Sequence, residues 1–338
     1  MTKLAPAPRL EASGPPEARG LRRVDVALLV ATRGDGALRH ARFRDLGRLL
    51  RSGDLLVVNN SKTLPAALPG RLAGRAVELR LSTPLQGGDW VVELRGSDLS
   101  PFDLPPIGGR VELPAGAHAE LLARFEASER LSVARLTLGR PLEGYLRRHG
   151  MPIRYPYLAE AWPMDAYQTV FALEPGSAEM PSAGRPFSAE LVVELVARGV
   201  HLAPVTLHAG VSSLERGEPP HPERYRVPAA TARFVNAVRA WGGRVIAVGT
   251  TVVRALETVA APDGTVGPGE GRTALIVTRQ RGLRAVDGLL TGWHEPASSH
   301  LDLLEAALGA ELLERSYRAA RAHGYRWHEF GDAHLILP

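Results

Sequence analysis

Short apolar runs alternate with polar turn residues along the chain, and their lengths indicate its elements. Residues 24–31, 55–59 and 245–248 are continuous apolar runs of this kind. Such runs, bounded by turn residues, are typical of strands that are buried on both faces of a parallel sheet. Residues 200–208 and 333–337 show the same pattern, so the sequence predicts a sheet assembled from distant segments.

Between these runs, apolar residues recur with helical spacing. Ser188 is placed to cap a helix that ends at Gly199 and has an apolar face of Leu191, Val192, Leu195 and Val196. Further helices are expected near residues 43–50, over residues 228–241 with Phe234, Val238 and Trp241 on one face, and between residues 297 and 323. Thr250 or Thr251 is expected to cap a helix after the strand at 245–248, and residues 273–278 and 283–289 are expected to pair as strands after a glycine-rich loop.

Residues 66–149 differ, because their apolar residues alternate with polar ones. The period of two is visible in segments 76–81, 90–95, 110–113 and 131–136, with turn residues between them. Closely spaced short strands without intervening helices favour a small antiparallel barrel. The expected fold is therefore α/β: a large mixed α/β domain, residues 1–65 plus 151–338, with a β-barrel domain, residues 66–150, inserted into it.

Composition narrows the class of protein without selecting an activity. The chain has 338 residues, 45% hydrophobic and 23% charged, and no cysteine, which excludes disulfides, thiolate catalysis and Cys-ligated metal sites. Its formal net charge of +5 permits a polyanionic partner but does not require one. No apolar run approaches the roughly 18 residues of a membrane span. Residues 1–20 lack the apolar core of a secretory signal, so we expect a cytoplasmic protein whose N-terminus is partly disordered. We also expect a monomer or a weak homo-oligomer.

Polar clusters lie beside several of the expected elements. Residues 207–210 and 291–299 lie at the ends of strands, residues 330–333 precede the last strand, residues 181–184 lead into the Ser188 helix, and residues 221–225 lie in a loop. The turn after the strand at 245–248 also leads into a helix N-terminus, whose unpaired N–H groups lie at the sheet edge where α/β folds bind ligands. No His-x-x-x-His spacing occurs, so no metal site is expected. The residue types leave a Ser–His–Asp triad open, although no G-x-S-x-G turn is present to hold its serine.

The clusters, in this order, resemble the S-adenosylmethionine:tRNA ribosyltransferase-isomerase family of queuosine biosynthesis. The most specific match is R-V-I-A-V-G-T-T at residues 244–251, followed by Arg254, Leu256 and Glu257. Other matching segments are spread in the family's order along nearly the whole chain, at residues 53–60, 167–171, 181–184, 205–210, 221–225, 286–298 and 331–333. The resemblance implies a mixed α/β domain interrupted by a β-barrel, as the patterning does.

The resemblance also implies an activity. Members of the family use S-adenosylmethionine as a substrate and transfer and isomerise its ribosyl part onto the aminomethyl group of a 7-deazaguanine in a tRNA anticodon. Epoxyqueuosine forms, and adenine and methionine leave. The sulfonium acidifies the adjacent C5′ proton, adenine departs best when it is protonated, and the incoming amine must be neutral to attack. A histidine with a pKa near neutrality suits the removal of the C5′ proton.

Candidate roles follow for the residues that match the family's motifs. The base is His294 or His208, and Asp332 or Glu257 orients that histidine or hydrogen-bonds the ribose or adenine. Arg254 is the expected counter-ion of the methionine carboxylate, and an i, i+3 surface pair with Glu257 is the alternative. The candidates for binding S-adenosylmethionine are Gly249, Thr250, Thr251, Arg254, Ser182, Ala183, Gly184, Trp293 and Gly331. The candidates for binding the acceptor are Asn59, Asn60, Tyr167, His221, Glu223 and Tyr225.

The chain departs from the family at several motifs. Residues 181–187 read P-S-A-G-R-P-F and lack the family's histidine, and G-S-D-L-S-P-F-D at residues 96–103 replaces a basic barrel segment. Phosphate contacts supply much of a protein's affinity for nucleic acid, so this replacement argues against tRNA. Two alternatives therefore stay open. One is a divergent paralogue that uses S-adenosylmethionine on a small-molecule acceptor or cleaves it without tRNA, and the other is a non-catalytic binding protein.

Overall fold

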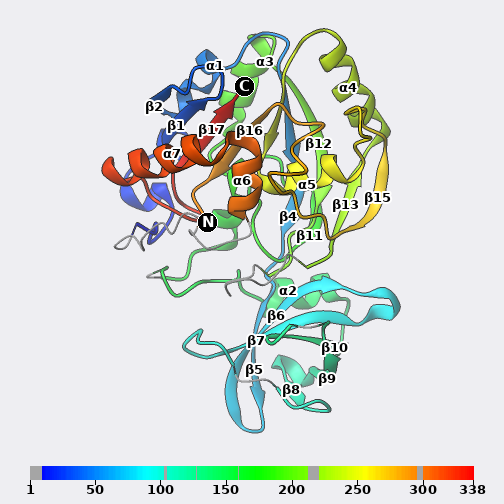
Figure 1. The fold of residues 1–338 in the computed structure, drawn as a ribbon. Coiled ribbons are helices and arrows are strands. Elements are labelled where there is room, and N and C mark those ends of the chain that lie inside the picture. Colours follow the sequence, from blue (N-terminus) through cyan, green and yellow to red (C-terminus); the bar gives the residue numbers. More distant parts are fainter. Residues whose placement is uncertain (1–9, 103–104, 127, 159, 212–220, 295–299) are drawn as a thin grey trace.

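The computed structural model describes residues 10–102, 105–126, 128–158, 160–211, 221–294 and 300–338, and its larger part is built on a 9-stranded mixed sheet (Figure 1). The strand order is β15-β13-β12-β3-β14-β16-β17-β1-β2. Strands β12, β3, β14 and β16 run parallel, and β17 is antiparallel to β16. Their bounds are β1 (Ala27–Thr32), β2 (Leu38–Arg42), β3 (Leu55–Asn59), β12 (His201–Leu207), β13 (Glu223–Val227), β14 (Val245–Val248), β15 (Gly269–Thr273), β16 (Gly288–Gly292) and β17 (Ala333–Leu337).

Both faces of this sheet are covered, which explains the continuous apolar runs. In β14, Val245 and Ala247 belong to the core formed with α4 to α7, and Ile246 and Val248 belong to the core formed with α1 and α3. Successive residues of a strand point to opposite faces, so four consecutive apolar residues serve two cores. The helices are α1 (Leu46–Leu49), α2 (Leu142–His149), α3 (Ala189–Ala197), α4 (Ala229–Ala240), α5 (Thr250–Thr258), α6 (His300–Leu308) and α7 (Ala310–Ala322).

The alternating segments form a closed antiparallel barrel ordered β10-β7-β6-β5-β8-β9, which lies below the large sheet in Figure 1. Its strands are β5 (Ala67–Leu72), β6 (Arg75–Pro84), β7 (Trp90–Gly96), β8 (Arg110–Glu112), β9 (His118–Arg124) and β10 (Leu131–Thr137), all within residues 66–150. A small parallel sheet, β4 (Ser61–Thr63) with β11 (Glu174–Ser177), lies between the two parts. The expected fold class, a mixed α/β domain with an inserted β-barrel, is confirmed.

The helix ends test the expected caps. Ser188 does cap α3, because its Oγ accepts the Leu191 N–H at 3.3 Å. The expectation for α5 is wrong: Gly249 is its N-cap, and both threonines lie inside the helix. The expected apolar face of α4 is also wrong at Trp241, which is 68% exposed, because the buried face is formed by Thr231, Ala232, Val235 and Val238.

The strands expected over residues 273–278 and 283–289 are wrong in most of their length. The first ends at Thr273 as part of β15, and the second contributes only the start of β16. Side chains hold the backbone between them: Arg254 donates to the carbonyls of Thr273 and Leu275, and Glu257 accepts the N–H groups of residues 284 and 285. These polar groups satisfy the backbone that a strand pair would otherwise satisfy.

The N-terminal segment is more ordered than its composition indicated. Ala12 is buried, and its N–H donates to the Trp327 carbonyl at 3.1 Å. The expectation of disorder is therefore wrong from Leu10 onward, and residues 1–9 lie outside the described residues, as does the expected helix start near residue 297. Among the helices of the described ranges, none is long and apolar enough to cross a membrane.

Candidate functional site

A cavity of about 250 Å³ lies where the large sheet meets the barrel. Residues that follow the carboxyl ends of β12, β14 and β16 line one side, and Ser82, Thr83 and Val91 of the barrel line another. Loops at the carboxyl ends of parallel strands converge, and residues of the polar clusters at 181–184, 207–210, 221–225 and 291–299 meet here, whereas none of residues 330–333 lines the cavity. The site candidates that line the cavity are Ser182, Ala183, Gly249, Thr250, Thr251, Arg254, Trp293, His294, Tyr167, His221 and Glu223.

The turn after β14 forms the most contiguous part of the wall. Gly249 has φ +99, and a Cβ at this position would lie 3.4 Å from the Cβ of Ala183. The 3.4 Å separation is an ordinary contact, so it is the backbone conformation, which glycine adopts without strain, that favours glycine here. No side chain of the described residues caps α5, and the Gly249 carbonyl accepts the N–H groups of Val252 and Val253. The N–H groups of Thr250 and Thr251 are therefore the ones available to a ligand.

Arg254 is held in a web of contacts at the edge of the cavity. Its guanidinium pairs with Glu223 and also donates to the carbonyls of Leu275 (3.2 Å) and Thr273 (3.1 Å). The other oxygen of Glu223 accepts the Gly210 N–H at 2.9 Å. Arg254 therefore pairs with Glu223 and not with Glu257, and it ties three segments of the cavity wall together.

His294 lines the cavity after β16. Its Nε2 lies 3.1 Å from Thr291 Oγ1. Tyr317 holds its backbone, because the His294 N–H donates to the phenol at 3.4 Å and the phenol donates to the His294 carbonyl at 3.3 Å. The ring is thus positioned from two sides. Within the described ranges, no group of three or more His, Cys, Asp or Glu side chains is arranged to hold a metal ion.

His208, the other candidate base, does not line the cavity. Its Nδ1 lies 2.8 Å from Ser61 Oγ, which in turn lies 2.6 Å from Ser177 Oγ. Burial, together with the nearby Arg224 guanidinium, lowers the pKa of His208 to about 4. The imidazole is therefore neutral at physiological pH, and this half-buried ring ends a hydrogen-bond chain whose two serines are buried.

The two acidic candidates, Asp332 and Glu257, also lie outside the cavity lining. Asp332 accepts the N–H groups of Ala27 and Arg326, each at 2.7 Å, and burial raises the pKa of its carboxyl. Glu257 pairs with Arg281 at 2.6 Å in addition to its two backbone contacts. Both carboxyls hold loops in place through these contacts.

The contacts of the remaining candidates hold strands and loops of the fold together. Asn59 donates to the Leu207 carbonyl at 2.8 Å and to Thr251 Oγ1 at 3.2 Å, so it braces β3 against β12 and α5. Asn60 accepts from Thr206 Oγ1 at 2.7 Å, and Tyr225 packs in β13 beside β15. Gly331 lets the backbone approach the Arg326 carbonyl, which would lie 2.4 Å from an added Cβ. Gly184, at the end of a short 3₁₀ helix, lies beside Thr169 and Phe171.

The opposite wall of the cavity contains residues that the sequence analysis missed. The rings of Tyr155, Tyr157 and His328 are stacked, with centroids 5.8 and 4.5 Å apart and interplanar angles of 17° and 14°. Tyr155 donates its hydroxyl to Glu179, and Tyr157 donates to Glu329. We call these five residues the tyrosine wall. Its one signal in the sequence is the Tyr-Pro-Tyr alternation at 155–157.

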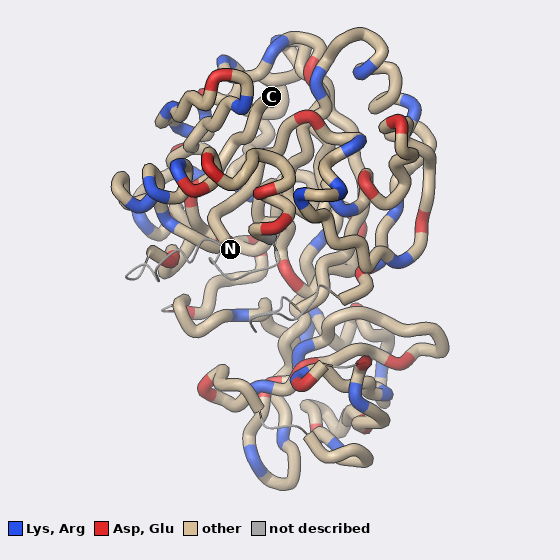
Figure 2. Tube along the Cα trace, in the orientation of Figure 1, with Lys and Arg blue, Asp and Glu red and all other residues tan. Residues whose placement is uncertain are grey.

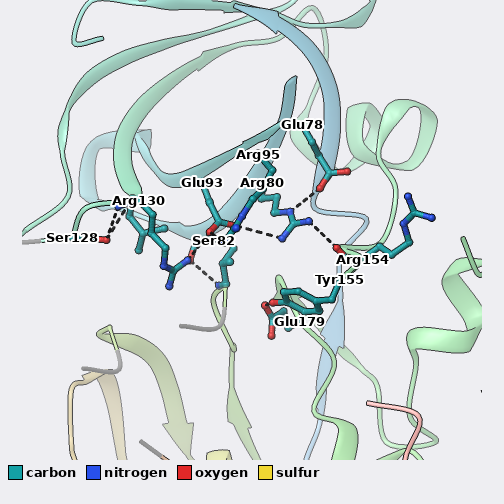
Figure 3. A network of polar contacts seen from close by, with 12 residues as sticks. Glu78, Arg80, Ser82, Glu93, Arg95, Ser128, Arg130, Arg154, Tyr155 and Glu179 are labelled. Carbon is teal, nitrogen blue, oxygen red and sulfur yellow. Dashed lines mark hydrogen bonds and ion pairs between the residues drawn. The ribbon is translucent and has the colours of Figure 1, made fainter. Parts of the chain in front are cut away.

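The barrel supports this wall through buried charges (Figure 3). The Arg80 guanidinium lies 5.5 Å from the Tyr155 ring centroid and donates to the Arg154 carbonyl at 2.7 Å. Arg80 also pairs with Glu78 at 2.7 Å and contacts the fully buried Glu93 at 3.4 Å. The network fixes the position of Tyr155 relative to the barrel.

Comparisons with known proteins agree with this architecture. A family model described as "Queuosine biosynthesis protein" matches residues 6–336. The S-adenosylmethionine:tRNA ribosyltransferase-isomerase of Moorella thermoacetica is 40% identical over 322 residues, which cover 92% of each protein. That of Thermus thermophilus is 39% identical over 345 residues, 96% of this chain and 97% of the relative.

A solved structure extends the likeness to three dimensions. The crystal structure of the S-adenosylmethionine tRNA ribosyltransferase from Thermotoga maritima is 29% identical in sequence and aligns with a TM-score of 0.56. The alignment covers 98% of this chain and 99% of that one. Both the barrel and the large sheet fall within the matched length, and the chain belongs to the queuosine biosynthesis protein family.

Proposed function

We propose that this protein transfers and isomerises the ribosyl part of S-adenosylmethionine onto a 7-aminomethyl-7-deazaguanine base in tRNA, giving epoxyqueuosine. The observation that carries the proposal is the cavity at the ends of β12, β14 and β16. It brings Ser182, Thr250 and His294 together in a chain 40% identical to a relative named for this reaction. The position of each residue in the cavity indicates which part of the substrates it contacts.

The residues after β14 suit the nucleoside part of S-adenosylmethionine. Such a ligand needs hydrogen-bond partners for its hydroxyl and carboxylate groups beside apolar surface for its ring. The first turn of α5 with the hydroxyls of Thr250 and Ser182 provides the former, and Ala183 and Trp293 provide the latter. Arg254 contributes by holding the wall, because Glu223 already balances its charge.

His294 is assigned as the base that takes the C5′ proton. S-adenosylmethionine supplies a sulfonium that acidifies this proton, and the protein must supply a positioned acceptor. Thr291 and Tyr317 fix the His294 ring and backbone, which limits the orientations that the imidazole can adopt. His208, Asp332 and Glu257 are assigned to supporting the loops behind the cavity.

The acceptor is assigned to tRNA, as in the named relatives. Figure 2 shows Lys and Arg distributed over both the barrel and the large domain, so basic groups remain despite the change at residues 96–103. Arg147 and Arg148 in the last turn of α2 are exposed. Nothing in the structure or the comparisons favours the small-molecule alternative. A tRNA substrate also implies a cytoplasmic location.

The test is a turnover assay with the full chain, S-adenosylmethionine and tRNA that carries the aminomethyl-deazaguanine. Adenine and methionine should be released and the tRNA base should gain the mass of the transferred ribosyl group, as measured by mass spectrometry. Unmodified tRNA with guanine at the same position is the matched control. Release of adenine without any RNA would instead support the small-molecule alternative, and binding without turnover would support a non-catalytic protein.

A further inference from the structure

Glu329 in the tyrosine wall is a cavity-lining acid that has no Arg or Lys partner in the described part of the chain. Among the residues that the structure describes, no Arg or Lys side chain lies within ion-pair distance of its carboxyl. Its hydrogen-bond partner is the Tyr157 hydroxyl. Glu223, in the same cavity, has Arg254 as its counter-ion. A half-buried carboxylate that no Arg or Lys side chain balances favours a ligand that brings a positive charge.

The groups that face Glu329 define its protonation. They are the Tyr157 phenol, the neighbouring His328 imidazole and, further away, the Tyr167 phenol. Burial raises the pKa of the Glu329 carboxyl, while the Tyr157 hydrogen bond and His328 act in the opposite direction. A raised pKa makes the carboxylate a stronger proton acceptor once it is ionised.

Glu329 lies on a loop that meets the loop of His294. The His328 N–H donates to the Trp293 carbonyl at 3.3 Å, and the residues that follow pair Ala333 with Gly292 in the β16–β17 ladder. The segment that carries the assigned base and the segment that carries Glu329 are therefore joined at the same edge of the sheet. A group bound by Glu329 is within the same cavity as the ribose that His294 acts on.

The stacked rings beside Glu329 suit a planar base. Parallel aromatic side chains hold unstacked bases of single-stranded RNA, and enzymes that act on a base first take it out of its stack. The acceptor base also carries an aminomethyl group, which resembles a lysine amine with a pKa of about 10.4 and is protonated at neutral pH. This ammonium is a cation that matches Glu329, and it must lose a proton before it can attack.

We propose that Glu329 binds the aminomethyl ammonium of the acceptor base and accepts its proton, while Tyr157 fixes the carboxyl and the ring stack holds the deazaguanine. One proton passes from the ammonium to the carboxylate, which leaves a neutral amine and a neutral carboxylic acid. The freed lone pair forms the new C–N bond to the ribosyl group, which gives up adenine and methionine over the whole reaction, and the nitrogen then loses a second proton. This inference rests on the proposed function and names its acceptor subsite.

The test compares wild-type protein with Glu329→Gln and with Glu311→Gln, an exposed glutamate on α7 as the matched control. Glu329→Gln should bind S-adenosylmethionine with unchanged affinity by calorimetry, which also shows that it is folded. Its single-turnover transfer to aminomethyl-deazaguanine tRNA should fall about 100-fold, the contribution of a general base. The acid limb of the wild-type pH–rate profile should disappear with it, and Glu311→Gln should behave as wild type.

Tyr157→Phe gives a second readout that a purely structural role would not move. Loss of the phenol donor raises the pKa of Glu329 further, so the acid limb should shift to higher pH while transfer persists. Wild-type-like transfer by Glu329→Gln would overturn the inference, as would loss of S-adenosylmethionine binding in that variant, which would assign the carboxyl to the donor. Wild-type protein that transfers nothing would overturn the proposed function itself.

Discussion

The loops after β12 and β16 carry the same kind of motif, a histidine at the end of a buried strand, and the fold uses them differently. His294 lines the cavity, whereas His208 turns toward Ser61 and Ser177 of the β4–β11 sheet. The difference comes from what covers each strand end: a small sheet closes over β12, and a cavity remains beside β16. A histidine at a strand end is therefore a candidate base only when the neighbouring layer leaves its ring accessible.

The largest expected effect separates the two histidines by chemistry. His294→Ala should slow single-turnover adenine release about 100- to 1,000-fold, because it removes the assigned proton acceptor. Binding of S-adenosylmethionine and the unfolding midpoint should change little, since the ring is only partly buried. His323→Ala, which alters an exposed histidine at the end of α7, is the control. Wild-type turnover in His294→Ala would remove this residue from the mechanism.

The second effect distinguishes His208 from His294 by the free energy of unfolding. His208→Ala should reduce the free energy of unfolding by about 3 kcal/mol, because it empties space beside Gly176 and removes the partner of Ser61. The protein that remains folded should keep its turnover. Urea unfolding and adenine release on the same preparation measure both quantities. A variant that lost turnover without losing stability would return His208 to the list of candidate bases.

The two sides of the cavity show what could be predicted from the sequence. The turn at Gly249 was predictable, because strand, turn and helix N-terminus are consecutive and each has a local signature. Tyr157 and Glu329 were not, because they are far apart in the chain and only the fold brings them together. The ion-pair partner of Arg254 could not be predicted either. Helical spacing offered Glu257 as a partner, whereas the fold pairs Arg254 with Glu223. The fold class depended on periodicity alone, so it was predictable.

A smaller effect tests the burial of His208 through pH. Burial lowers its pKa to about 4, against about 6.5 in the unfolded chain. Between these values the unfolded chain binds a proton that the folded protein does not, so stability falls as pH falls from about 6.5 to about 4. We expect about 2 kcal/mol from this residue after allowing for partial solvent screening.

The measurement is urea unfolding of wild type and His208→Ala at several pH values in this window. The buried His334, whose pKa burial also lowers to about 3, contributes equally to both proteins and cancels in the difference. The variant should therefore show a shallower loss of stability with acid. Parallel curves for the two proteins would mean that the His208 ring is accessible to protons, like a ring in the cavity.

The smallest expected effect tests the role of Ser177, at the far end of the hydrogen-bond chain that links Ser177, Ser61 and His208. Ser177 Oγ is fully buried, accepts the Ala209 N–H at 3.0 Å and contacts Ser61 Oγ. Ser177→Ala should cost about 1 kcal/mol, because one hydrogen bond is lost while Ser61 can still satisfy His208. Ser61→Ala should cost more, since it also removes the hydroxyl that contacts Nδ1 of the half-buried His208 imidazole. Both should retain turnover. If Ser177→Ala instead stopped adenine release at unchanged stability, the Ser–Ser–His chain would have to carry a proton to the cavity, and the contrast between the two histidines would no longer hold.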